Sequence, residues 1–250
     1  MKKLTSILLL LLFVWTVQAQ TAREEIRANR YLSANNYYAY PTPTAKQTAA
    51  PKGYEPFYIS HYGRHGSRYH SKEKAYAQPL DALRRAAGAG KLTPKGQEVL
   101  AKVEALAEDA RLRYGDLSPR GTAEHRGIAE RMYAAYPGVF STDGGCVCRV
   151  ESRSTLVPRC ILSMAAFNER LKELNPEIRM TRESSQRYIP YMSNGAGLNS
   201  QRKASGAVAD SLQDARTHPA RLMASLFSDP AFVERAVSYT HLTLPTNSLV

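Results

Sequence analysis

The sequence predicts an α/β fold. Short apolar runs that are typical of strands lie at residues 57–60 and 146–151, and they alternate with longer amphipathic stretches that carry helix start signals. These strands and helices occupy residues 53–182. The Gly-, Asn- and Ser-rich run at residues 193–200 has the composition of a loop, so we expect residues 183–236 to begin a mostly helical cap.

The N-terminus has the features of a secretory signal peptide. Lys2 and Lys3 precede an apolar run at residues 7–17, and residues 1–19 end in a small side chain, as signal peptidase requires. The run is too short to span a bilayer, which disfavours the alternative of a stable membrane anchor. We therefore expect cleavage after residue 19, an N-terminal arm at residues 20–52, and export to the periplasm or the cell exterior.

Residues 64–68, with the sequence Arg-His-Gly-Ser-Arg, follow the first expected strand and carry the clearest chemistry of the chain. The guanidinium groups of Arg64 and Arg68 suit the oxygens of a phosphoryl group, and His65 between them can attack its phosphorus. The two positive charges disfavour protonation of His65, so its ring should stay neutral at lower pH than a free histidine. Gly66 has no Cβ, which lets the backbone approach an anion. The alternative is a solvated basic loop.

Two helices have a start signal in which a hydroxyl residue precedes proline. They are expected after Thr93 and after Ser118, with proline at the first helical position. Their apolar stripes are Val99, Val103, Leu106 and Ala110 in the first helix and His125, Ile128, Met132 and Ala135 in the second. We interpret His125 as a packing histidine rather than a catalytic one, because it lies on the apolar face of its helix.

A second basic block follows the strand expected at residues 146–151. Arg159 comes after the Arg-Ser-Thr run at residues 153–155, where Thr155 could cap a helix. The apolar stripe of that helix is Cys160, Met164, Phe167, Leu171 and Leu174. Arg159 would then lie in the first turns, where the helix end favours an anion; the alternative is a surface ion pair with a carboxylate.

The charge of the chain favours an anionic partner. The formal net charge is +12, but the basic residues are dispersed and no aromatic motif accompanies them, which argues against nucleic acid and favours a small phosphorylated molecule. The cysteines are Cys146, Cys148 and Cys160, an odd number for an exported chain. Because no second cysteine pair or nearby histidine accompanies them, we expect no zinc or other metal site.

The blocks at residues 64–68 and 153–159 resemble the two phosphate-binding motifs of the histidine phosphatases, in the branch that contains acid phosphatases and phytases. Residues 117–126 resemble the helix opening of that family, which usually has Gln-His where this chain has Glu124 and His125.

Two details are most similar to bacterial multiple inositol polyphosphate phosphatases. They are the ending of the first motif at residues 68–70 and the tyrosine- and proline-rich arm at residues 37–44. The resemblance covers about residues 30–236.

The resemblance implies a central mixed sheet flanked by helices, with a mostly helical cap. It implies that His65 is the catalytic nucleophile of a phosphohistidine mechanism and that Arg64, Arg68 and Arg159 bind phosphate, without a cofactor. The implied substrates are inositol polyphosphates such as phytate, with Arg202 and Lys203 as candidate contacts from the cap. The alternatives are a general acid or sugar-phosphate phosphatase, and a non-catalytic exported phosphate-binding protein.

The C-terminal stretch at residues 237–250 looks like translated sequencing-adapter DNA, and the alternative is a genuine β-rich end. The proton donor of the family lies in a later His-Asp or His-Ala-Glu motif, and neither occurs in this sequence. We therefore expect an N-terminal fragment, truncated within the fold, that is weak or inactive as a catalyst because it lacks the general acid.

Overall fold

The computed structural model describes residues 22–33, 38–44, 48–192, 211, 219–229 and 231–232. Outside these residues lie the expected signal peptide, most of the expected cap with Arg202 and Lys203, and the stretch at residues 237–250. No helix in the described part of the chain is long and apolar enough to cross a membrane. The chain divides into two compact units, Met1–Thr48 and Ala49–Val250.

The first unit contains helix α2 (Ala22–Ala28) and the 3₁₀ helix η1 (Arg30–Ser33), neither of which has a buried residue. The rings of Tyr31 and Tyr38 stack with their centroids 5.5 Å apart. This unit is therefore held by local contacts, without a core of its own in the described residues.

The second unit contains a β-α-β arrangement. Strand β1 (Arg149–Ser154) leads into helix α6 (Pro158–Leu174), which returns the chain to strand β2 (Arg179–Ser184). The strands are parallel, in a register that runs from Arg149 opposite Arg179 to Ser154 opposite Ser184. The predicted α/β class is confirmed at this level, while the larger mixed sheet stays an expectation because the described sheet has two strands.

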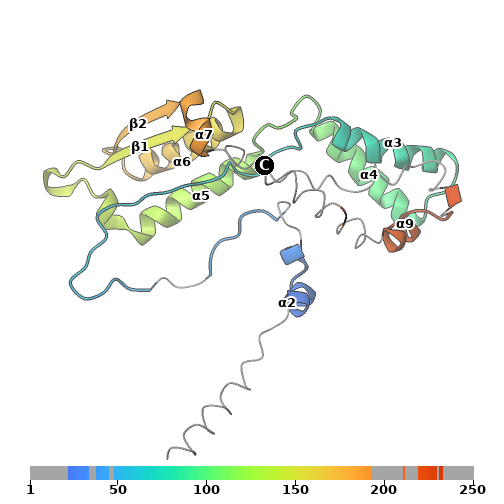
Figure 1. Cartoon of the computed structure of the whole chain (residues 1–250), viewed down its shortest axis with the longest axis horizontal. Coiled ribbons are helices and arrows are strands. Elements are labelled where there is room, and N and C mark those ends of the chain that lie inside the picture. The colour runs from blue at the N-terminus through green and yellow to red at the C-terminus, as the bar shows by residue number, and fades with distance from the viewer. Residues whose placement is uncertain are drawn as a thin grey trace, which may run out of the picture. The chain divides into compact units, whose positions relative to one another are not determined.

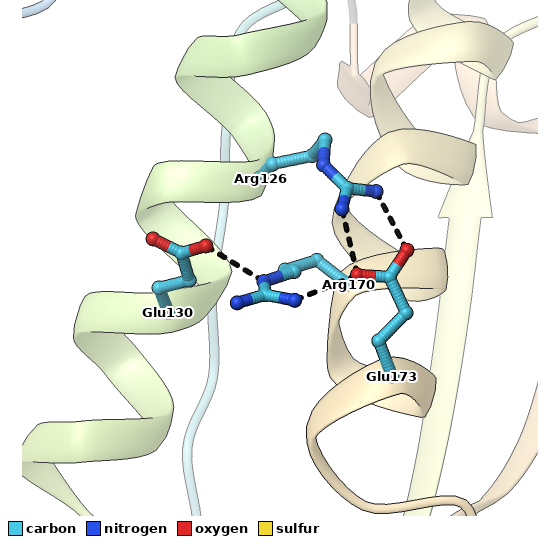
Figure 2. Close-up of polar contacts among 4 residues, drawn as sticks. All are labelled: Arg126, Glu130, Arg170 and Glu173. Atoms are coloured by element: carbon cyan, nitrogen blue, oxygen red, sulfur yellow. Dashed lines mark hydrogen bonds and ion pairs between the residues drawn. The ribbon is translucent and has the colours of Figure 1, made fainter.

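Helix α5 (Pro119–Ala135) packs beside α6 (Figure 1). The buried core around them contains Ala129, Phe140, Cys148, Leu171 and Ile178. Four charged side chains join the outer faces of the two helices (Figure 2). Arg126 donates two hydrogen bonds to Glu173, at 2.9 and 2.6 Å, and Arg170 donates to Glu130 and to Glu173, both at 2.7 Å.

Short elements complete this part of the chain. The 3₁₀ helices are η3 (Pro137–Phe140), η4 (Asp143–Gly145) and η5 (Gln186–Tyr188), and the short helix α7 is Ile189–Met192.

A second group of helices is built on apolar contacts. Helix α3 (Lys74–Gly88) packs on α4 (Pro94–Asp109), and α9 (Ala220–Leu226) packs on α4 (Figure 1). Their core contains Ala82, Leu83, Ala86, Leu92, Met223 and Phe227. No predicted site residue lies in this group.

The predicted helix starts are confirmed. The hydroxyl of Thr93 accepts a hydrogen bond from the backbone N–H of Gly96 at 3.0 Å, and that of Ser118 accepts from Gly121 at 3.2 Å. The stripe predicted for α4 was wrong at Leu106, which is 54% exposed, although Ala110, the next residue of the stripe, is fully buried.

Two predicted strands differ from the structure. Residues 57–60 form no strand: Phe57 is 91% exposed, and these residues have no backbone ladder with another strand in the described part of the chain. The strand predicted at residues 146–151 starts later, at Arg149, because its pairing with β2 begins there and the preceding turn contains Gly144 and Gly145 at positive φ.

The predicted cap of α6 was also wrong. The N-cap residue is Val157, which makes no side-chain cap hydrogen bond, and Pro158 at the first helical position has no N–H to satisfy. Thr155 lies two residues further back, so its hydroxyl cannot reach the first free N–H groups. Its Oγ1 is buried without a hydrogen-bond partner among the described residues.

Candidate functional site

Residues 67–70, at the end of the first basic block, run antiparallel to the segment that precedes α5. The backbone N–H of Ser118 donates to the carbonyl of Ser67 at 2.9 Å, and that of Tyr69 donates to Asp116 at 3.0 Å. The hydroxyl of Ser118 also donates to the Ser67 carbonyl, at 2.8 Å. The cap of α5 therefore holds the block and the helix together.

Two glycines make this contact possible. A Cβ at Gly66 would lie 2.4 Å from the carbonyl oxygen of Gly121, and a Cβ at Gly121 would lie 2.2 Å from that of Ser67. Both distances are far below van der Waals contact with backbone atoms that cannot swing aside. The block can approach the first turn of α5 only because neither residue has a side chain.

Glu124, one turn further along α5, holds Ser67 with both carboxylate oxygens. The backbone N–H of Ser67 donates to Oε2 at 2.7 Å, and its hydroxyl donates to Oε1 at 2.8 Å. The Glu124 side chain is only 10% exposed, so these bonds are well shielded from water. The ionised carboxylate, which is an acceptor only, suits two donors from one residue.

His125 is buried, which confirms the prediction of a packing histidine, but it also has a specific contact. Its Nε2 lies 3.1 Å from the carbonyl oxygen of Arg64, and because a carbonyl only accepts, Nε2 carries the proton. Burial lowers the pKa of His125, and the bond to Arg64 opposes this only in part. A neutral imidazole thus fixes the backbone at the start of the block.

His65 has the protonation state that a nucleophile requires. Its Nδ1 donates to the carbonyl of Gly66 at 2.8 Å, which leaves the lone pair on Nε2. Burial is the main cause that lowers its pKa; the bond to Gly66 opposes this, and the charges of Arg159, Arg64 and Arg68 lower it further. The expected direction is confirmed, with burial contributing more than the arginines.

The two basic blocks lie in the same region of the molecule, since the Ser163 hydroxyl bonds both the Gly66 N–H and the Arg159 carbonyl, and the charges of Arg64, Arg68 and Arg159 each lower the pKa of His65. Arg159 lies in the first turn of α6, beyond the carboxyl end of β1, where open α/β sheets commonly bind ligands. Its Nε is buried and has no hydrogen-bond partner in the described structure.

The guanidinium of Arg159 reaches the loop before α5. Its Nη1 would lie 3.7 Å from a Cβ at Gly115, a residue with a φ of +82°. Arg68 donates from Nη1 to the carbonyl of Tyr69 at 2.8 Å, which fixes the direction of its side chain. Guanidinium groups suit the oxygens of tetrahedral oxyanions, so these three arginines and the neutral imidazole of His65 make up the candidate site.

Sequence reasoning missed the residues that hold the site in place. Glu124 and Ser163 make side-chain hydrogen bonds to the backbone of the block from 57 and 97 residues away. A usable signal was present for Glu124, because it lies next to His125 on the face of α5 that follows the Ser118 cap. Ser163 lies within an apolar helix stripe and gave no signal.

In the described ranges no group of three His, Cys, Asp or Glu side chains is placed to hold a metal ion. Cys146 is exposed, Cys148 is buried and Cys160 is intermediate, and all three are free thiols. Burial raises the pKa of Cys148, so its thiol stays protonated.

No protein-family model matches this chain, and no curated protein matches it. The chain is similar to three crystal structures of the multiple inositol polyphosphate phosphatase of Bifidobacterium longum. The complex with inositol hexasulfate is 27% identical with a TM-score of 0.43, the complex with phosphate 26% with 0.45, and the apo form 28% with 0.45. Each match covers 56% of this chain and 29% of the other, so this chain spans less than a third of those enzymes.

Proposed function

We propose that this protein is a phosphomonoesterase that works through a phosphohistidine at His65. The observation that carries the proposal is a neutral imidazole whose Nδ1 bonds to the Gly66 carbonyl, which leaves the Nε2 lone pair available, and whose pKa the charges of Arg159, Arg64 and Arg68 help to lower. A protonated histidine could not attack phosphorus, and an isolated one would lack the charge needed to bind a phosphate dianion.

The proposed reaction has two steps. Nε2 of His65 attacks the phosphorus, the bond from phosphorus to the ester oxygen breaks, and the departing alkoxide takes up a proton from solvent water. Water then attacks the phosphohistidine, the phosphorus–nitrogen bond breaks, and phosphate leaves. The arginines neutralise the oxygens of the phosphoryl group in both steps.

The proposed substrates are inositol polyphosphates such as phytate. A formal net charge of +12 raises the local concentration of a highly charged anion, and the motif resemblance points to the same class. Comparing the hydrolysis of phytate with that of glucose 6-phosphate tests this choice, because a general sugar-phosphate phosphatase would prefer the second.

Export is part of the proposal. It rests on Lys2, Lys3 and the apolar run at residues 7–17, which are features of a cleaved signal peptide. N-terminal sequencing of the protein secreted from a bacterial host checks it: we expect the mature chain to begin at Gln20, and a retained N-terminus would contradict export by this route.

The experiment that tests the mechanism uses 2,4-dinitrophenyl phosphate. Its phenolate leaves without a proton, so the first step needs only the nucleophile and the arginines. We expect a burst of phenolate and a phosphorylated His65, detected by mass spectrometry after an alkaline quench. His65→Ala should abolish both but still bind phosphate.

The matched control is His61→Ala, the same change in a nearby histidine whose ring stacks on Phe167, with ring centroids 5.4 Å apart. It should retain the burst. A wild-type burst in His65→Ala would remove His65 from the nucleophile role, whereas phosphate binding without any burst in the wild type would favour a non-catalytic binding protein.

A further inference from the structure

Ser163 touches both basic blocks through hydrogen bonds. It lies on α6, one turn after Arg159, and is only 3% exposed. Its hydroxyl donates to the carbonyl of Arg159 at 2.7 Å and accepts from the backbone N–H of Gly66 at 3.1 Å. Both its donor and one acceptor position are therefore used.

The first of these bonds is common, because a serine inside a helix often donates to the carbonyl four residues before it. The second bond is unusual, since it crosses from α6 to the block that contains the nucleophile. It anchors Gly66, whose carbonyl accepts the hydrogen bond from Nδ1 of His65. A continuous path thus leads from the backbone of Arg159 through Ser163 and Gly66 to the imidazole.

We propose that Ser163 is a positioning residue that fixes the Nδ1–H tautomer of His65 and its place relative to Arg159. The Ser163 hydroxyl holds the Gly66 N–H, while Glu124 holds the N–H of Ser67 in the peptide unit that carries the Gly66 carbonyl. Loss of the Ser163 bond frees one side of Gly66, and the imidazole has the lone pair on Nε2 only while the Gly66 carbonyl holds the proton on Nδ1. The consequence for phosphoryl transfer rests on the function proposed above. The effect on the tautomer does not.

The competing explanation is that Ser163 is an ordinary buried serine whose bonds only stabilise the fold. The chain offers a matched control for this in Ser152, on β1. Its hydroxyl donates to Oδ1 of the fully buried Asn168 on α6 at 2.9 Å. This hydrogen bond does not involve the basic block at residues 64–68. Ser152→Ala therefore removes one interior hydrogen bond of α6, as Ser163→Ala does, without touching Gly66.

The experiment compares the full-length wild type, Ser163→Ala and Ser152→Ala, each labelled with ¹⁵N histidine. Ring ¹⁵N chemical shifts at neutral pH report the tautomer of His65, whose signals are identified by their absence in His65→Gln. We expect a single Nδ1–H tautomer in the wild type and in Ser152→Ala, and a mixture in Ser163→Ala. Orthovanadate affinity should fall roughly tenfold in Ser163→Ala alone, the effect of one buried hydrogen bond.

Ser163→Cys keeps the packing in case the alanine variant does not fold. The thiol is a weak hydrogen-bonding group, so the same tautomer change should appear to a smaller degree. An unchanged tautomer in the folded Ser163 variants, or an equal change in Ser152→Ala, would overturn the role of Ser163. If the wild type binds no vanadate, the proposed function fails, and the tautomer comparison still decides this inference.

Discussion

Helices α4 and α5 open with nearly the same sequence, Leu-Thr-Pro-Lys-Gly at residues 92–96 and Leu-Ser-Pro-Arg-Gly at residues 117–121, yet they serve different parts of the molecule. Each opening is joined to a distant segment by an isolated antiparallel bridge. Leu92 pairs with Phe227 beside α9, and Leu117 pairs with Arg68 in the basic block.

The contacts at the two openings correspond in detail. The hydroxyl of Thr93 donates to the carbonyl of Ser225 at 2.6 Å, as the hydroxyl of Ser118 donates to that of Ser67 at 2.8 Å. A Cβ at the glycine that follows would meet a backbone oxygen of the docked segment in both cases, at 2.1 Å in α4 and 2.2 Å in α5. The same local pattern therefore holds a segment of the apolar core against α4 and the basic block at residues 64–68 against α5.

The difference lies one turn further along each helix. Val99 and Leu100 of α4 pack against the apolar core, whereas the corresponding residues of α5 are Glu124 and His125, which bond to the backbone of the basic block. The opening of each helix therefore holds a distant segment of the chain against that helix. The side chains of the next turn determine whether the helix packs into the apolar core or positions the candidate site.

The largest expected effect comes from filling the two glycine contacts. Gly121→Ala and Gly96→Ala should each destabilise the fold by about 3 kcal/mol, because the new Cβ meets a backbone carbonyl. Urea unfolding measures this loss. Only Gly121→Ala should also abolish vanadate binding by displacing Ser67. Equal loss of vanadate affinity in both variants would show that the two docking contacts are not independent.

Replacing the residues after the openings should give the next largest effect. Glu124→Ala leaves the buried N–H of Ser67 without an acceptor, which costs about 2 kcal/mol and should weaken vanadate binding at least tenfold. Val99→Ala removes half-buried methyl groups and costs about 1 kcal/mol. Isothermal titration should show unchanged vanadate affinity in the second variant, and a matching loss there would refute the distinction.

The pH dependence of stability should also distinguish α5, which contains His125, from α4. Burial holds the pKa of His125 below its usual 6.5. The imidazole of His125 therefore binds a proton more readily in the unfolded chain than in the folded protein. The contribution of neutral His125 is fully present above pH 6.5 and is lost as the pH falls through the lower folded value.

His125→Gln keeps a donor for the Arg64 carbonyl but does not titrate. Urea unfolding at pH 7.5 and 5.0 should therefore show a smaller loss on acidification in His125→Gln than in the wild type. Leu100→Met, at the matching position of α4, should leave the loss unchanged. Identical pH profiles for His125→Gln and the wild type would contradict a neutral, buried His125.

The exposed ion pairs should give the smallest effects. Hydrogen bonds from Arg126 and Arg170 lower the pKa of Glu173 to about 2, and those from Lys102 and Lys95 lower that of Glu98 to about 2. Glu173→Gln breaks a link between α5 and α6, whereas Glu98→Gln affects α4 alone. We expect slightly lower melting temperatures, more so for Glu173→Gln, and both differences should vanish in high salt.

The sequence predicted most local features, with the cap of α6 as an exception, and it predicted long-range features poorly, for a physical reason. Caps such as Ser118 and the amphipathic stripe of α6 depend on neighbours within a few residues. A strand at residues 57–60 needs a partner that the local pattern does not specify. Without one in the described structure, Phe57 and Tyr58 lie exposed, and Ile59 packs against the core around α5 and α6.

The same reason explains the site. Arg64, His65 and Arg68 could be named from the sequence because they lie together in residues 64–68, a pattern of residue types that suits phosphate. Ser163 could not, because its partner Gly66 is distant in sequence and comes near only when α6 packs. Glu124 had a local signal beside His125, but the sequence did not indicate its distant partner, Ser67.

A crystal structure of the full-length protein with orthovanadate tests the central claim most directly, because vanadate is a tetrahedral oxyanion that accepts a fifth ligand as phosphorus does during transfer. The account predicts vanadium bonded to Nε2 of His65, with the guanidinium groups of Arg64, Arg68 and Arg159 on its oxygens. Vanadate bound elsewhere, or bound without contact to His65, would contradict it.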